Sequence, residues 1–105
     1  MRNVNQIEWR ELVAKDGNAV IIDVRTPLEW EDGILENAQL LNVLEPESFM
    51  EKVTLLEKEK NYYVYCRSGI RSKTACKILE SAGVENTFNL RGGIRKWGGN
   101  KVFPD

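Results

Sequence analysis

The chain has 105 residues, of which 42% are hydrophobic and 30% are charged, and its formal net charge is −1. A chain of this length forms one hydrophobic core, so we expect a single domain over residues 1–105. The small net charge gives no general attraction to nucleic acid or to an anionic membrane surface, and no apolar run approaches the roughly 18 residues that a membrane span needs. Because the N-terminus also lacks a signal-peptide hydrophobic region, the composition favours a cytoplasmic protein.

Histidine is absent from the chain, and cysteine occurs only at Cys66 and Cys76. This composition excludes a Ser-His or Cys-His nucleophile pair, a zinc site with imidazole ligands and a metal site built from four thiolates. A nucleophilic cysteine in this chain therefore has to be activated by backbone N–H groups and arginines rather than by a neighbouring base.

The first predicted element is a helix that begins at Asn5, because Glu8 follows it at the spacing of a helix start, and that ends at residues 16–18. The apolar residues expected on its buried side are Ile7, Trp9, Leu12 and Val13. Thr26 is expected to cap a later short helix that begins at Pro27, since proline suits the first helical position.

Strands and helices alternate along the rest of the chain. Strands are predicted over residues 19–24, 39–43, 62–65 and 87–90, and the later helices are predicted from Pro46, over residues 73–82 and after Gly93. This alternation indicates βαβ crossovers, so we expect an α/β fold with a mostly parallel central sheet of about five strands and helices on both faces.

Three motif-bearing segments each lie at the carboxyl end of a predicted strand: residues 23–25, 66–71 and 91–93. In parallel sheets of this kind, ligands bind at the carboxyl ends of the strands. We therefore expect the three segments to meet at one edge of the sheet and to form the functional site there.

The segment from Cys66 to Ser72 carries the strongest chemical signal. A cysteine at a strand end, followed by a short loop with glycine and two arginines and then by a helix, predicts a thiolate held by inward-pointing N–H groups and the positive helix end. Such settings lower a cysteine pKa from about 8.5 into the range of roughly 3.5–7.5. We expect Cys66 to be the catalytic nucleophile, and Cys76, which lies mid-helix among apolar residues, to be part of the core.

The expected substrate-binding residues are those of the loop itself: Arg67, Ser68, Gly69, Ile70, Arg71 and Ser72. Arg67 is expected to be exposed and to attract an anionic substrate. Arg71 either contacts the substrate anion or pairs with an acidic residue and holds the loop in shape, and we favour the second role. Ser68 and Ser72 either donate a hydroxyl hydrogen bond to the sulfur or cap the following helix.

Asp23 and Arg25, at the end of the early strand, are expected to support the loop without contacting the substrate. Asp23 can accept hydrogen bonds from the N–H groups of the loop or from arginines. Arg25 can pair with Glu29, four positions further along the chain.

Three ordered segments of this chain together resemble the rhodanese-like sulfurtransferases. Residues 21–30 match an early motif in which an apolar strand ends in Asp-x-Arg, residues 66–71 match an active-site loop with four residues between cysteine and arginine, and residues 89–97 match a late Gly-Gly-x-x-x-Trp motif. The chain departs from the family at Ile34, where histidine is common, and at Asn37, where a second glycine is common. Asparagine tolerates the left-handed backbone conformation, so Asn37 is expected to keep the turn.

The resemblance implies a rhodanese-type thiosulfate sulfurtransferase. In this mechanism the Cys66 thiolate takes the outer sulfur of a small anionic donor such as thiosulfate, becomes a persulfide and passes the sulfur to a thiol, to cyanide or to a protein acceptor. No metal, organic cofactor, nucleic acid or membrane partner is implied, and the oligomeric state stays open.

Three alternative functions are also open. One is a persulfide carrier that relays sulfur between proteins through the same Cys66. Another is a phosphatase-like or arsenate-reductase-like enzyme, although those relatives have five residues between cysteine and arginine where this chain has four. The third is a non-catalytic binding module.

Overall fold

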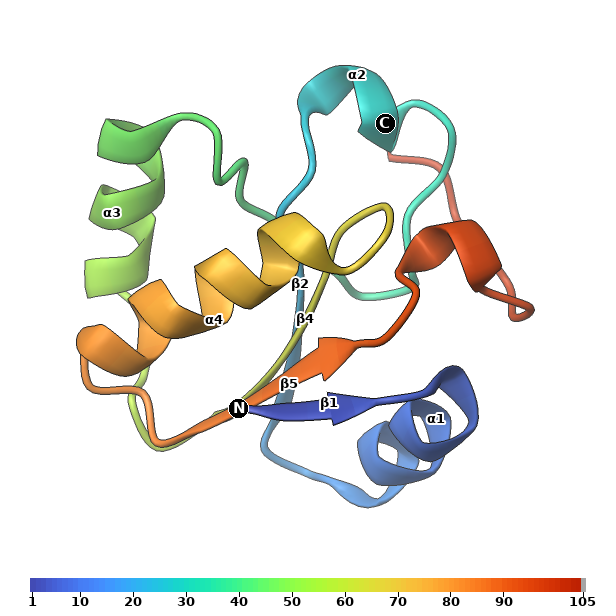
Figure 1. The fold of residues 1–105 in the computed structure, drawn as a ribbon, viewed down its shortest axis with the longest axis horizontal. Helices are drawn as coiled ribbons and strands as arrows, with labels where there is room; N and C mark the ends of the chain where they lie inside the picture. Colours follow the sequence, from blue (N-terminus) through green and yellow to red (C-terminus); the bar gives the residue numbers. More distant parts are fainter. Residues whose placement is uncertain (105) are drawn as a thin grey trace.

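The computed structural model describes residues 1–104, which form a five-stranded sheet with the strand order β1-β5-β4-β2-β3 (Figure 1). All four strand pairings are parallel. The strands are β1 (Arg2–Val4), β2 (Ala19–Asp23), β3 (Gln39–Leu40), β4 (Asn61–Tyr65) and β5 (Asn86–Leu90). The predicted α/β fold with a parallel central sheet is therefore confirmed.

Four α-helices and one 3₁₀ helix connect the strands. They are α1 (Gln6–Lys15), α2 (Pro27–Trp30), α3 (Pro46–Thr54), α4 (Ile70–Ser81) and the 3₁₀ helix η1 (Ile94–Lys96). The predicted caps are confirmed: the Asn5 side chain accepts a hydrogen bond from the Glu8 N–H at 2.9 Å, and Thr26 forms a capping box with Glu29.

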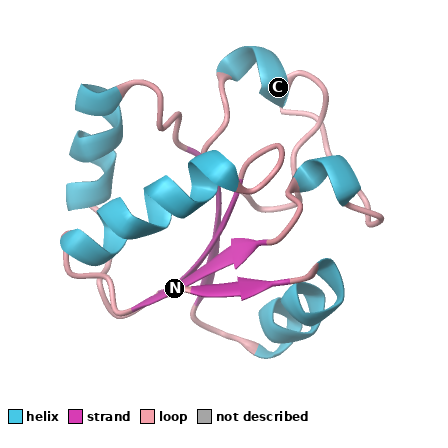
Figure 2. Cartoon of the chain, viewed as in Figure 1, coloured by secondary structure: helices cyan, strands magenta, loops and turns pink. Residues whose placement is uncertain are grey.

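Helices cover both faces of the sheet, as predicted (Figure 2). On one face, α3 and α4 pack on the inner strands through a core that includes Phe49, Val53 and Leu79. On the other face, Trp9 of α1 and Ile94 of η1 pack against Tyr63 and Tyr65 of the central strand β4. The short helix α2 lies instead at the edge of the sheet where the strands end.

Three sequence-based predictions about the elements are wrong. Ile7 is 68% exposed, because it is two residues from Trp9 and a helix turns by 3.6 residues, which places the two side chains on nearly opposite sides. The third strand covers only Gln39–Leu40 rather than residues 39–43. Helix α4 begins at Ile70, three residues earlier than residue 73, so the loop after Cys66 is shorter than expected.

The strand β1 is a further feature that the sequence did not predict. It has three residues, of which only Val4 is buried, and it pairs with β5 at the edge of the sheet. Among the helices of residues 1–104, none combines the length and the apolar character needed to cross a membrane.

Candidate active site

Cys66 lies directly after β4 at the carboxyl edge of the sheet, and it is 1% exposed. Its sulfur is enclosed by the backbone of the loop that follows. The Gly69 N–H donates to Sγ at 3.1 Å and the Ser72 N–H donates at 3.4 Å. Gly69 has a φ of 104°, a left-handed conformation that glycine adopts easily, and it turns the chain so that α4 starts with its N–H groups facing the sulfur.

The pKa of the Cys66 thiol is lowered from its ordinary value. Burial acts against the charged thiolate, and hydrogen bonds to that thiolate from the Ser72 hydroxyl and from the N–H groups of Ser72, Gly69 and Ser68 outweigh it. Since the sequence contains no histidine, this lowering comes from hydrogen-bond donors of the loop and helix start. The arrangement can therefore hold a thiolate without a base beside it.

The segment that begins with Gly92 and Gly93 and continues into η1 holds the loop by backbone hydrogen bonds. The Ile94 N–H donates to the Cys66 carbonyl oxygen at 3.0 Å, and the Arg95 N–H donates to the Arg67 carbonyl oxygen at 3.0 Å. Gly93 has a φ of 64°, and a Cβ atom at this position would collide with the Arg67 carbonyl group. The motifs at residues 66–71 and 91–93 therefore meet, as the sequence predicted.

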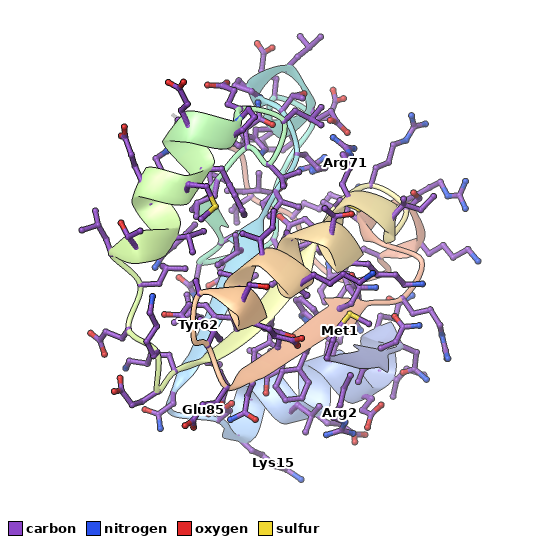
Figure 3. All side chains as sticks on the ribbon, turned by 60° about the vertical axis from the view of Figure 1, so that its left-hand side comes forward. Met1, Arg2, Lys15, Tyr62, Arg71 and Glu85 are labelled. Atoms are coloured by element: carbon purple, nitrogen blue, oxygen red, sulfur yellow. The ribbon has the colours of Figure 1, made fainter. Side chains whose placement is uncertain are left out.

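Arg71 forms a bidentate ion pair with Glu29 of α2, with nitrogen–oxygen distances of 2.7 and 2.8 Å. Figure 3 shows Arg71 near the N-terminal end of α4, on the side of that helix nearest α2. The hydrogen bond from Arg71 lowers the pKa of Glu29 to about 2. The expected pairing of Arg71 with an acidic residue is therefore present, and it joins α2 to the loop.

Asp23 and Arg25 form a buried pair, 0% and 4% exposed. Arg25 donates from Nε to Asp23 Oδ1 at 3.0 Å and from Nη2 to Asp23 Oδ2 at 2.7 Å. Arg25 also donates to the backbone carbonyl oxygens of Glu29 at 3.3 Å and of Gly33 at 2.8 Å. Arg25 therefore contacts Glu29 as predicted, but through the backbone carbonyl oxygen, and the ion pair of the Glu29 carboxylate is with Arg71.

The two serines of the loop differ. Ser72 is fully buried in the first turn of α4, with its Oγ 3.3 Å from Cys66 Sγ, whereas Ser68 is exposed and approaches the sulfur through its backbone N–H. Neither serine caps the helix, because Gly69 occupies the cap position. The cap interpretation of Ser68 and Ser72 is therefore wrong.

Asn89 was missed in the sequence. It is fully buried on β5 and accepts a hydrogen bond from the Ser72 hydroxyl. The sequence of β5 is NTFNL, so Asn89 is one of several polar residues there and no local signal distinguished it. A buried amide in such a strand needs hydrogen-bond partners, and here they belong to the site.

A basic rim, defined as Arg67, Arg95 and Lys101, surrounds a cavity of about 290 Å³ beside the loop. All three side chains are exposed, as expected for Arg67. Asp32 also lines this cavity, together with the Glu29 and Arg25 side chains that are paired elsewhere. Arg67 was expected to attract an anion, but nothing in the sequence indicated that Arg95 and Lys101, from the last segment of the chain, would lie beside it.

Ile70, Cys76 and Asn37 lie outside the hydrogen-bond network around the Cys66 sulfur. Ile70 is 74% exposed at the start of α4. Cys76 is fully buried in α4, and burial raises the pKa of its thiol to about 12, consistent with the predicted core position. Asn37 has a φ of 66°, so it keeps the turn as expected.

Comparison with known proteins assigns the family. The family described as "Rhodanese-like domain" matches residues 7–100. A protein named sulfurtransferase from Allochromatium vinosum is 37% identical over 98 residues, which cover 90% of this chain and 88% of the relative. The crystal structure of a rhodanese-related protein from Thermoplasma volcanium aligns with a TM-score of 0.84 at 30% identity, covering 99% of this chain and 100% of that one.

Relatives with other names also match this chain. A tRNA uridine(34) hydroxylase from Protochlamydia amoebophila is 28% identical over 102 residues, which cover 92% of this chain and 32% of the relative. The match of the family over residues 7–100, the likeness along nearly the whole chain and the strand-end loop around Cys66 agree with one another. This chain belongs to the rhodanese-like domain family.

Proposed function

We propose that this protein is a sulfurtransferase of the thiosulfate type, in which Cys66 carries the transferred sulfur as a persulfide. The observation that carries the proposal is the enclosure of Cys66 Sγ by the Gly69 and Ser72 N–H groups, with the pKa of the thiol lowered. The relative named sulfurtransferase supports the same class of reaction.

In the first half-reaction, the Cys66 thiolate attacks the outer sulfur of thiosulfate. A lone pair of Sγ forms the new sulfur–sulfur bond while the sulfur–sulfur bond of thiosulfate breaks, and sulfite leaves with that electron pair. No proton transfer is needed, which suits a site that is built without histidine. The loop N–H groups stabilise the thiolate before the attack and the persulfide after it.

In the second half-reaction, a thiolate or cyanide attacks the outer sulfur of the persulfide. The bond between the two sulfurs breaks, and Cys66 leaves as a thiolate that is again stabilised by the loop N–H groups. Because the donor product leaves before the acceptor reacts, we expect ping-pong kinetics.

The basic rim supports an anionic donor. The charge of Arg71 is balanced by Glu29, and the charge of Arg25 is balanced by Asp23, so neither is free to attract substrate from solution. Arg67, Arg95 and Lys101 remain around the cavity, opposed there by Asp32. Attraction of an anion to a chain with a net charge of −1 therefore has a local source.

The spacing of the loop argues against the phosphatase-like alternative. Four residues separate Cys66 from Arg71, and the N–H groups of this short loop close on the sulfur itself. In addition, Arg71 is held by Glu29 rather than directed to the centre of the loop, where a phosphatase would bind the oxygens of its substrate.

The test is sulfur transfer from thiosulfate to cyanide with two cysteine variants. Cys66→Ser should fall to background activity, because a hydroxyl at this position cannot form the persulfide. Cys76→Ser should keep most of the activity, since Cys76 is buried in the core with its pKa raised. Turnover near the wild-type rate in Cys66→Ser would refute the proposal.

A further inference from the structure

A buried chain of hydrogen bonds leads from the Cys66 sulfur to the edge strand of the sheet. Cys66 Sγ lies 3.3 Å from Ser72 Oγ, and the Ser72 hydroxyl donates to Asn89 Oδ1. Asn89 Nδ2 in turn donates to Asn3 Oδ1 at 2.9 Å and lies 3.5 Å from the Gly69 carbonyl oxygen. Ser72 and Asn89 are both 0% exposed, so water does not replace these contacts.

The orientation of the Asn89 amide follows from its neighbours. The Gly69 carbonyl oxygen can only accept, so the NH₂ group of Asn89 has to face it. The Oδ1 atom then faces Ser72, and because this atom also can only accept, the Ser72 hydroxyl has to be the donor.

The Ser72 hydroxyl has one proton, and two acceptors compete for it. While the proton is on the side of Asn89, Ser72 Oγ can only accept a hydrogen bond from the Cys66 S–H, which favours the neutral thiol. A Cys66 thiolate instead needs the proton turned toward Sγ, and Asn89 then loses its bond. The hydroxyl turns between two partners without giving up its proton.

We propose that Asn89 is a positioning residue that limits the fraction of Cys66 present as thiolate by competing with the sulfur for the proton of the Ser72 hydroxyl. This inference rests on the proposed role of Cys66 as the nucleophile. During turnover the hydroxyl faces Asn89 in the thiol and persulfide forms, where Sγ carries no charge, and turns to Sγ whenever the thiolate forms. Asn3 and Gly69 hold the amide so that it presents Oδ1 and not its NH₂ group.

The charged and titratable groups around Cys66 lie on the loop, on β2 and the segment after it, on α4 and on η1. They are Arg67, Asp23, Arg25, Arg71, Cys76 and Arg95. None of them is a hydrogen-bond partner of Asn89 among the contacts of residues 1–104. A change at Asn89 that acts through Ser72 therefore leaves these charges in place.

The test is the pH dependence of Cys66 alkylation by iodoacetamide, followed on the peptide that contains Cys66. Asn89→Leu removes the competing acceptor at similar volume, so the Ser72 proton becomes available to Sγ. We expect the pKa of Cys66 to fall and the alkylation rate, at a pH below both pKa values, to rise about tenfold. Thr87→Val is the matched control, because Thr87 is also buried on β5 but bonds to Glu80, and it should leave the profile unchanged.

The same substitution made in a Ser72→Ala protein distinguishes this mechanism from a general loosening of the loop. In Ser72→Ala the shared proton is absent, so Asn89→Leu should no longer change the alkylation profile. An unchanged profile for Asn89→Leu, or the same change in both backgrounds, would overturn the inference. If Asn89→Leu does not fold, Asn89→Ala gives the same comparison. Because alkylation needs no sulfur donor, this outcome is independent of whether thiosulfate reacts at Cys66.

Discussion

At the scale of single residues, the chemistry of Cys66 depends on the direction of a few N–H groups. The Gly69 and Ser72 N–H groups point at the sulfur because Gly69 takes a left-handed φ and α4 begins at the next residue. Cys76, which lies on α4 itself, has no such loop around it and is buried among apolar side chains. The pKa of Cys66 is therefore lowered, whereas the pKa of Cys76 is raised.

This contrast predicts selective alkylation of the native protein. At pH 7, iodoacetamide should modify Cys66 faster than it modifies an ordinary thiol, because the lowered pKa gives a larger thiolate fraction. Cys76 should stay unmodified until the protein unfolds, because its pKa of about 12 and its burial leave almost no reactive thiolate. Peptide mapping checks this prediction, and equal modification of both cysteines would contradict it.

At the scale of elements, the ion pair between Glu29 and Arg71 fastens α2 to the start of α4. The two side chains are about one quarter exposed, so solvent screens part of their attraction. The pair lies at the end of the loop that follows Cys66, since Arg71 is the second residue of α4. Arg67, by contrast, is exposed and lies on the basic rim.

The division of labour between the two arginines is testable. Arg71→Ala and Glu29→Gln should each lower the stability by about 1 kcal/mol, or roughly 5 °C in Tm, because each breaks a bidentate pair that is partly screened. Arg71→Ala should also lower the rate of sulfur transfer. Arg67→Ala should leave Tm nearly unchanged and lower kcat/KM for thiosulfate. Thermal unfolding and kinetics distinguish the cases, and equal losses of Tm for Arg67→Ala and Arg71→Ala would contradict the assignment.

The same ion pair gives a pH dependence with a definite sign. The pKa of Glu29 is about 2 in the folded protein and 4.5 as its ordinary value, so the unfolded chain binds more protons between these values. The stabilisation is complete above about pH 4.5 and is lost as the pH falls through about 2. The difference in Tm between the wild type and Glu29→Gln should therefore shrink on acidification over this range.

At the scale of the whole molecule, much of the architecture was predictable because it depends on local patterns. The strand 19–24, the helix from Pro46 and the loop at Cys66 follow from apolar periodicity, caps and a known motif spacing. Some misses, such as Ile7 and the start of α4, concern local periodicity and element boundaries, whereas others depend on contacts between distant segments. Neither β1 nor Asn89 carries a local signal of its role, which comes from the pairing of Asn3 with Asn89 across β1 and β5.

Arg95 and Lys101 lie beside Arg67 because of the same kind of contact between distant segments. Arg95→Ala and Lys101→Ala should raise KM for thiosulfate with little change in kcat, and the effect should shrink at high salt because exposed charges are screened within about 8 Å at physiological ionic strength. Lys77→Ala, an exposed lysine on α4 outside the basic rim, is the control and should leave KM unchanged. Equal effects of all three variants would mean that the attraction is not local.

The central claim is that Cys66 forms a persulfide, and intact-protein mass spectrometry after incubation with thiosulfate tests it most directly. Freshly reduced protein is needed, because a nucleophilic thiol is also prone to oxidation. The account predicts the addition of a single sulfur atom that maps to the Cys66 peptide, is removed by cyanide or a reducing thiol, and is absent from Cys66→Ser. The same preparation should show negligible hydrolysis of an aryl phosphate. Robust phosphatase turnover without any sulfur adduct would contradict the account.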